Sequence, residues 1–252
     1  MQIGLIGAGS MARALARGWR RPVVCADPIA ARAQALAEEL GGRVAASNVE
    51  VARSADLLVL CHKPAQLAEV AAEVAPEARA VASILALTPL SAVKEAYPGR
   101  PVYRFIPSLA AEVRVGAIVE ARDQPQDPLL DGEVTRLFSE LGSLVVLDDR
   151  LLDVAMGLMS CAPAYLALVA EAQVDAGVRL GLGADDAARL VVETLAGTAR
   201  LLEAHDRDTL ALRRAVSSPG GATARGLDAL ERAGVRSAFS AALDAAVGGR
   251  SR

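Results

Sequence analysis

The stretch Gly7-Ala8-Gly9-Ser10-Met11-Ala12 decides the fold of this chain. It follows a short apolar run, Gln2–Ile6, and it opens a helical pattern that continues to Trp19. An apolar run, a glycine turn and a helix in this order are typical of the first unit of a dinucleotide-binding domain. The N-terminal part of the chain is therefore predicted to be a Rossmann-type α/β domain.

Each position of the glycine turn has a physical reason. Gly7 makes the tight turn out of the strand, Gly9 leaves space for a pyrophosphate, and the small Ala12 lets helix and strand pack closely. The amide N–H groups at the helix start, around Ser10 and Met11, favour an anion. We therefore predict that these five residues bind the cofactor phosphates.

An acidic residue follows the second apolar run, Val23–Ala26. Asp27 lies 20 residues after Gly7, where a carboxylate can accept hydrogen bonds from both ribose hydroxyls of NAD and repel a 2′-phosphate. Arg32 lies five residues later and can reach a 2′-phosphate, which leaves NADP open. The sequence thus predicts NAD or NADP as cofactor, and Asp27 favours NAD.

Strand and helix patterns alternate as far as Leu147, which predicts a doubly wound, parallel sheet with helices on both faces. The expected strands after the first are Val23–Ala26, Asp56–Cys61, Ala80–Leu85, Pro101–Phe105, Gly116–Glu120 and Ser143–Leu147. The expected helices after the first are Ala30–Leu40, Ala65–Val74, Leu90–Ala96 and Glu133–Leu141, the last preceded by a Pro- and Asp-rich loop, Arg122–Asp131.

After Leu147 only helical periodicity remains. Helices are expected over Leu151–Gly181, Ala184–Glu203, Thr209–Val216, Thr223–Ala233 and Ser237–Val247. We therefore expect two domains: residues 1–149 bind the dinucleotide, and residues 150–252 form an all-helical domain.

Composition excludes some partners. The net charge of −3 gives no electrostatic reason to expect nucleic acid or an anionic membrane. Met1 leads directly into a strand pattern without a basic segment, so we expect a cytoplasmic protein. The longest uncharged stretch, Val154–Ala170, is short for a membrane span and contains Pro163. It is expected to be buried in a core or a subunit interface.

The metal-binding side chains are few. Cys25, Cys61 and Cys161 lie in apolar surroundings without a CxxC spacing, so we expect buried thiols. The two histidines, His62 and His205, lack a ligand-like pattern, and no metal site is expected.

A second glycine loop lies near the C-terminus, at Ser217-Ser218-Pro219-Gly220-Gly221-Ala222-Thr223. Proline and glycines bend the backbone, and the loop delivers free N–H groups and hydroxyls to the start of a helix. Such a helix start binds a small carboxylate, although a capped turn has the same composition.

With these features on one chain, the sequence resembles the pyrroline-5-carboxylate reductases over nearly its whole length. The motifs that carry the resemblance are Gly7–Ala12, His62-Lys63-Pro64, Pro163-Ala164-Tyr165, Asp175-Ala176-Gly177-Val178 and Ser217–Thr223. The resemblance implies a Rossmann domain followed by a helical dimerisation domain, and hydride transfer from NAD(P)H to 1-pyrroline-5-carboxylate, a cyclic imino acid, giving proline. It also implies a homodimer or a larger oligomer of dimers.

The resemblance also assigns residues. Ser218 and the backbone of Gly220, Gly221, Ala222 and Thr223 hold the substrate carboxylate, and Thr223 lies beside the imine nitrogen. His62, Lys63 and Pro64 adjoin the nicotinamide, Lys63 as a catalytic candidate. Ser108 occupies the place of a cofactor-facing asparagine.

Two segments depart from the family pattern. Ile106-Pro107-Ser108-Leu109-Ala110 stands where the family usually has Met-Pro-Asn-Thr-Pro, and Met159–Ala162 is bulkier than its usual Ser-Gly-Ser-Gly. Two alternatives therefore remain: reduction of a different cyclic imine, or a non-catalytic regulatory protein that binds a dinucleotide.

Overall fold

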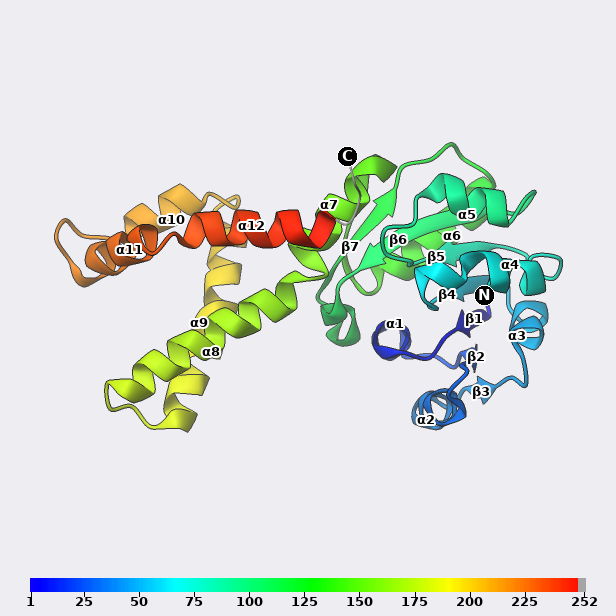
Figure 1. The fold of residues 1–252 in the computed structure, drawn as a ribbon, viewed down its shortest axis with the longest axis horizontal. Coiled ribbons are helices and arrows are strands. Elements are labelled where there is room, and N and C mark those ends of the chain that lie inside the picture. The colour runs from blue at the N-terminus through cyan, green and yellow to red at the C-terminus, as the bar shows by residue number, and fades with distance from the viewer. Residues whose placement is uncertain (249–252) are drawn as a thin grey trace. The chain divides into compact units, whose positions relative to one another are not determined.

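A computed structural model describes residues 1–248 of the chain. Contacts between residues divide the chain into two compact units, Met1–Pro163 and Ala164–Arg252. The first unit holds a β-sheet with its helices, and the second consists of helices (Figure 1).

The sheet has the order β3-β2-β1-β4-β5-β6-β7-β8 within residues 1–248. All neighbouring strands are parallel except β6 and β7, which are antiparallel. The chain therefore reverses direction once, between Pro107 and Gly116, and the predicted doubly wound α/β architecture is otherwise confirmed. The strands are β1 Ile3–Ile6, β2 Val24–Ala26, β3 Arg43–Val44, β4 Leu57–Leu60, β5 Val81–Ser83, β6 Val102–Pro107, β7 Gly116–Ala121 and β8 Gly142–Leu147.

Alternate strand residues point to opposite faces of the sheet and form two separate cores. On one face, Leu58 and Leu60 pack with helices α3 (Asn48–Ser54), α4 (Leu67–Val74), α5 (Leu90–Ala96) and α7 (Leu152–Met159). On the other face, Leu57 and Val59 pack with α1 (Ser10–Trp19), α2 (Ala30–Leu40) and α6 (Pro128–Ser139). Because β4 is buried on both faces, its sequence is continuously apolar instead of alternating.

Several local expectations were wrong. Strand β3 and helix α3 were not expected, because β3 has only two residues and both are exposed. Helix α6 begins five residues before its expected start, since Asp127 caps it by accepting from the N–H groups of Leu129 and Leu130, and Pro128 stands at its first position.

The expected helix Leu151–Gly181 is two helices, α7 and α8 (Ala162–Arg179). The break falls at Ser160 and Cys161, just before Pro163, which is tolerated in the first turn of a helix but not inside one. By length and composition alone, the stretch Asp149–Arg179 across this break is apolar enough to span a membrane. It is the only such stretch in the described part of the chain.

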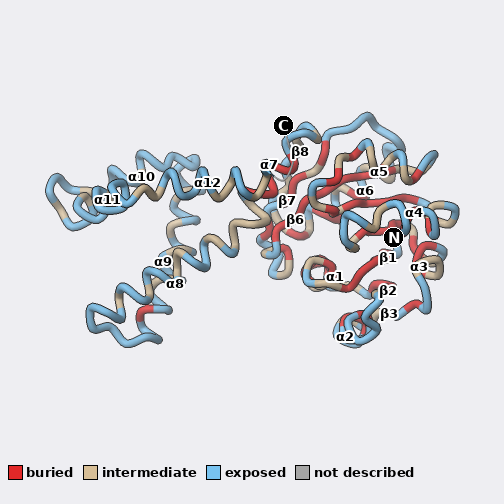
Figure 2. Tube along the Cα trace, in the orientation of Figure 1, coloured by how far each residue is buried: buried red, intermediate tan, exposed pale blue. Residues whose placement is uncertain are grey.

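The second unit has almost no core of its own. Its further helices are α9 Ala184–Ala204, α10 Thr209–Ala215, α11 Ala222–Arg232 and α12 Val235–Val247. Within residues 164–248 only Ala187 is buried, and Figure 2 shows the buried residues concentrated in the first unit, on its strands and on the helices that pack against them. Large apolar side chains are exposed instead, among them Leu166, Leu168, Leu190, Val192 and Phe239. Val154–Ala170 is thus part core, through Ala155 and Met156, and part exposed apolar surface.

Candidate dinucleotide and carboxylate sites

The glycine turn after β1 is required by the protein's own backbone. Gly7 has φ +101°, and a Cβ at this position would lie 2.8 Å from the carbonyl oxygen of Cys61, at the end of β4. Only glycine combines this φ with so close an approach. The Gly7 N–H donates to Ala26 O at 2.8 Å, so the turn joins the carboxyl ends of β1, β2 and β4.

Gly9 differs from Gly7, because no contact within the protein requires a glycine at this position. Its φ is −72°, and an added Cβ would meet no atom of the described chain within 4 Å. A glycine facing open space at the start of a helix leaves room for a group outside the chain. Behind it, Ala12 is 1% exposed and packs in the core. The first-turn N–H groups of α1, beginning at Ser10, have no carbonyl of their own helix to bind.

A cavity of about 410 Å³ adjoins this turn. Its lining residues come from the ends of β1, β2 and β4 and from the helices that follow: Ile6, Gly7, Gly9, Asp27, Pro28, Ile29, Arg32, Asn48, Cys61, His62, Lys63, Gln66 and Val70. The carboxylate of Asp27 accepts from the N–H groups of Ala8, at 2.7 Å, and Ile29, at 2.8 Å. The acidic group is therefore held in a fixed orientation at the cavity wall.

A second cavity, of about 310 Å³, shares three residues with the first: Cys61, His62 and Lys63. The rest of its lining is Met11, Pro64, Ile84, Leu85, Ala86, Ile106, Pro107, Met156 and Ser160. Two cavities joined by one loop, with the glycine turn beside them, fit an elongated ligand such as a dinucleotide. The space in front of Gly9 fits its phosphates, and Asp27 fits its adenosine ribose.

The loop His62-Lys63-Pro64 forms the common wall. His62 Nδ1 lies 2.9 Å from the carbonyl oxygen of Lys63, and its Nε2 is buried without a hydrogen-bond partner in the described chain. Burial lowers the pKa of His62, although its contact with the Lys63 carbonyl acts in the opposite direction. Lys63 is exposed, and its backbone N–H donates to the Gln66 side chain at 3.2 Å, which fixes the turn into Pro64–Gln66.

Ser108 was expected at the cofactor. In the structure its hydroxyl and its backbone N–H both form hydrogen bonds with strand β7. It is 4% exposed, its hydroxyl oxygen accepts from Ala117 N–H at 3.0 Å, and its own N–H donates to Ala117 O at 2.9 Å. Among the described residues it does not line either cavity, whereas its neighbours Ile106 and Pro107 line the second.

Helix α7 and the residue that follows it bring Met156 and Ser160 to the second cavity. Met156 was not expected there, whereas Ser160 belongs to the Met159–Ala162 segment, which the family resemblance places at the helix that borders the active site. The Ser160 hydroxyl donates to Pro107 O at 3.1 Å, so the end of this helix is tied to the end of β6. Met156 reaches the cavity through tertiary packing, and no local motif indicates its place. Ile84 was also missed, yet its place after β5 was a usable signal, because ligands bind at the carboxyl ends of parallel strands.

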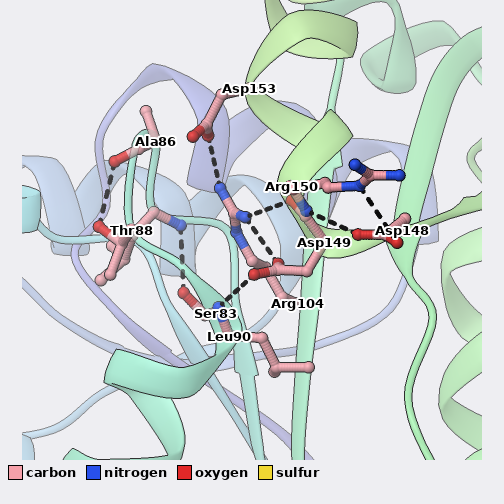
Figure 3. Close-up of polar contacts among 10 residues, drawn as sticks. Ser83, Ala86, Thr88, Leu90, Arg104, Asp148, Asp149, Arg150 and Asp153 are labelled. Atoms are coloured by element: carbon pink, nitrogen blue, oxygen red, sulfur yellow. Dashed lines mark hydrogen bonds and ion pairs between the residues drawn. The ribbon is translucent and has the colours of Figure 1, made fainter. Parts of the chain in front are cut away.

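A buried ion cluster fixes the start of α7 (Figure 3). Arg104 of β6 is 1% exposed, and its guanidinium donates to the carboxylates of Asp149, at 2.7 Å, and Asp153, at 2.6 Å. The other oxygen of Asp149 accepts from Leu90 N–H, at the start of α5. One arginine thereby joins β6, α5 and α7 and sets the position from which Met156 and Ser160 extend.

The loop Ser217–Thr223 belongs to the second unit. Gly220 has φ +64°, and Gly221 N–H donates to Ser218 O at 3.0 Å, closing a turn against which the Ser218 hydroxyl packs. Helix α11 starts at Ala222, and its first intrahelical bond is from Arg225 N–H to Gly221 O. The N–H groups of Ala222 and Thr223 are therefore free of helical partners, and the Thr223 side chain is exposed.

Other candidate chemistry is sparse. The three cysteines are free thiols, and burial raises the pKa of both Cys25 and Cys61. Within residues 1–248 no cluster of three potential metal ligands occurs.

The geometry of the first unit defines a dinucleotide-binding domain of the Rossmann class. Comparisons with known proteins agree. Residues 2–87 match the family model described as NADP oxidoreductase, coenzyme F420-dependent, and residues 149–251 match pyrroline-5-carboxylate reductase dimerisation.

Relatives extend the match to the full length. A pyrroline-5-carboxylate reductase of Synechocystis is 33% identical and covers 98% of this chain and 96% of its own length. The structure of the Streptococcus pyogenes enzyme is 26% identical, with a TM-score of 0.91 over 98% of this chain and 97% of that one. The Plasmodium falciparum enzyme, with NADP bound, has the same fold at 24% identity, with a TM-score of 0.89 over 98% and 96%. The chain belongs to the pyrroline-5-carboxylate reductase family.

Proposed function

We propose that this protein reduces 1-pyrroline-5-carboxylate to L-proline with NADH or NADPH. The observation that carries the proposal is the family's full-length match together with an intact Ser217–Thr223 loop, whose N–H groups at Ala222 and Thr223 lack helical partners. A helix start of this kind binds a carboxylate, which the substrate carries.

When bound, NADH or NADPH would supply a hydride for the imine carbon, and an imine that enters already protonated on its nitrogen would become the neutral amine without a further proton donor. In the proposed arrangement the residues of this chain bind and orient the reactants. Ser218 and the amides of residues 220–223 hold the substrate carboxylate, and the Thr223 hydroxyl hydrogen-bonds the ring nitrogen. Lys63 and Pro64 form the wall beside the nicotinamide. Holding the reacting carbons in near-contact and excluding water are the main contributions to the rate.

Asp27 and Arg32 decide between NAD and NADP in this proposal. The Asp27 carboxylate is fixed by two backbone N–H groups at the cavity wall, where it favours the free hydroxyls of NAD. The Arg32 side chain lines the same cavity and has no hydrogen bond or ion pair in the described residues. We propose that both cofactors bind and that NADH is preferred.

A second candidate is reduction of a different cyclic imine. It is favoured by the second cavity, whose wall includes Met156 and Ser160 but not Ser108, since the Ser108 hydroxyl accepts from Ala117 N–H in the sheet. The non-catalytic alternative keeps only nucleotide binding. All three are separated by one assay: purified protein with NADH or NADPH is given pyrroline-5-carboxylate, then six-membered and sulfur-containing cyclic imines. Oxidation of the cofactor with the five-membered substrate is expected. Binding without turnover of any imine supports the regulatory alternative.

Thr223 offers a sharper test of the site. Thr223→Val removes the hydroxyl at similar volume and is expected to lower kcat about ten-fold or more with little change in NADPH affinity. Thr223→Ser keeps the hydroxyl and should retain most activity. Equal losses of kcat and NADPH affinity in Thr223→Val contradict the proposed place of Thr223.

Assembly follows from the second unit. The exposed apolar side chains of its helices would form an unusually apolar surface on a monomer. We propose that they are buried in a homodimer, on which larger oligomers can be built, and that the apolar stretch Asp149–Arg179 serves this interface and not a membrane. We further propose that the functional boundary between the domains lies at residues 149/150. The protein is proposed to be cytoplasmic and to bind no nucleic acid. Sedimentation of wild type and Leu168→Asp tests it, since the variant should be monomeric.

A further inference from the structure

Helix α11, which follows the Ser217–Thr223 loop, begins without a cap from the chain. Its N-cap residue, Gly221, has no side chain that could accept a hydrogen bond, and no acidic residue lies in the first turn. The N–H groups of Ala222 and Thr223 are free of helical partners. A helix start with neither a capping oxygen nor a carboxylate leaves its positive end without a balancing group.

Arg225 adds a cation at this same end of the helix. Its guanidinium donates through Nη1 to the carbonyl oxygen of Gly220 at 2.6 Å, so the side chain folds back along the first turn onto the loop. The Arg225 backbone N–H also donates to Gly221 O, at 3.2 Å. One residue therefore holds the carbonyls of both loop glycines. A cation at a helix N-terminus is normally unfavourable, because it faces the positive end of the helix dipole.

No carboxylate of α11 balances this charge. The two acidic residues of the helix already pair with other arginines, Asp228 with Arg232 and Glu231 with Arg236. Arg225 is exposed and has no ion pair among the described residues. Free N–H groups, the helix dipole and an unpaired guanidinium thus meet at one loop, and each favours an anion from outside the chain.

We propose that Arg225 is a positioning residue that strengthens the binding of the substrate carboxylate. Its contact with Gly220 O fixes the peptide plane between Gly220 and Gly221, where Gly220 has φ +64°, and so orients the turn that leads to the free N–H groups. Its charge adds to their attraction for the carboxylate. The inference rests on the carboxylate loop of the proposed function, and it assigns Arg225 a role in substrate affinity and none in hydride transfer.

Three substitutions separate the charge of Arg225 from its hydrogen bond. Arg225→Met removes both at similar length, Arg225→Gln keeps a neutral N–H donor, and Arg225→Lys keeps a charged donor. Arg225→Met should raise the KM for 1-pyrroline-5-carboxylate about three- to five-fold, the effect of one exposed charge interaction, with kcat and the KM for NADPH nearly unchanged. Arg225→Lys should recover most of the lost affinity, and Arg225→Gln only part of it.

Binding of the product gives a readout that needs no turnover. L-Proline carries the same carboxylate, and its affinity for the complex of the full-length protein with NADP⁺ is measured by calorimetry. Arg225→Met should weaken L-proline by the same factor as the substrate. Added salt should weaken L-proline more in wild type than in Arg225→Met, because screening acts on the charge that the variant lacks.

The matched control is Arg189→Met, which removes an exposed arginine of α9 that pairs with Glu193 at 2.9 Å. Its KM for the imino acid and its affinity for L-proline should equal those of wild type. Circular dichroism melts confirm that each variant is folded.

The outcomes are distinct. Wild-type KM and L-proline affinity in Arg225→Met, or equal salt dependence in the two proteins, overturn the inference. A parallel loss of kcat, NADPH affinity and melting temperature also overturns it, because it would show a structural role alone. Imine reduction that is indifferent to Arg225 leaves the proposed function standing. A protein that reduces no imine but binds L-proline through Arg225 keeps the inference and removes the function, and one that binds neither overturns both.

Discussion

The guanidinium of Arg104 donates through Nη2 to the Asp153 carboxylate at 2.6 Å, and the side chains are 1% and 7% exposed. A buried charge pair of this kind connects the interior strand β6 to α7, the helix that carries Met156 and is followed by Ser160 at the second cavity. Its energetic importance lies in what happens when one partner is lost.

Arg104→Met should lower the free energy of unfolding by about 3–5 kcal/mol, because two aspartates lose their buried partner. Urea denaturation measures the change. The matched control is Arg150→Ala, whose side chain is 80% exposed and pairs with Asp148 at 3.4 Å; it should change stability by no more than about 0.5 kcal/mol. Similar effects of the two substitutions would show that burial of the cluster does not matter.

Gly9→Ala should weaken NADPH binding about ten-fold or more while the melting temperature stays nearly constant, since the new methyl group overlaps only the cofactor. Gly7→Ala is the contrasting variant: its φ of +101° and the Cys61 carbonyl 2.8 Å away make it lower the melting temperature even without cofactor. Fluorescence titration and thermal melts separate the two. A Gly9→Ala protein with wild-type affinity would place the phosphates elsewhere.

Asp27→Ser should raise the ratio of kcat/KM for NADPH over NADH by about ten-fold, because a negative charge no longer faces the 2′-phosphate. Serine retains one oxygen for the Ala8 or Ile29 N–H. Arg32→Ala should move the same ratio in the opposite direction with NADH almost unaffected. Steady-state kinetics with both cofactors provides the check, and an unchanged ratio in Asp27→Ser refutes the assignment.

His62 also gives the protein a pH dependence. Burial lowers its pKa in the folded state, so the unfolded chain binds the proton more readily. Stability should therefore fall as pH decreases through about 6.5, the ordinary histidine value, toward the lower folded pKa. His62→Val should lose less stability than wild type over that window in cofactor-free melts. Parallel pH curves for the two proteins would mean that the imidazole is not desolvated.

The parts of the fold and of the site that could be predicted from the sequence are those that neighbouring residues specify. The continuous apolar run of β4 predicts a strand buried on both faces of a parallel sheet. The turn at Gly7 and Gly9 predicts a nucleotide site at the carboxyl ends of the strands. Gly7 is required by backbone geometry, and such a requirement leaves a direct trace in the sequence. The Ser217–Thr223 loop is similar, because its turn and helix start are made by adjacent residues.

Other features depend on tertiary packing and have no local trace. Ser108 was expected at the cofactor, and its hydroxyl instead completes a hydrogen bond with β7, a strand whose antiparallel direction no local motif reveals. From the sequence Arg104 looks like an ordinary strand residue, and only the fold places Asp149, in the turn before α7, and Asp153 of α7 against it. The same cluster holds the start of the helix from which Met156 and Ser160 reach the cavity.

The scarcity of buried side chains in α8 to α12 has a consequence for how the stability of these helices depends on protein concentration. Within its described residues, 164–248, the helical unit buries only Ala187, so it gains little free energy from folding by itself, and on the proposed dimer its melting point should rise with protein concentration. Dilution should loosen these helices long before it affects the sheet. On the proposed dimer, a newly synthesised copy would need to associate with a second one before its C-terminal helices become stable.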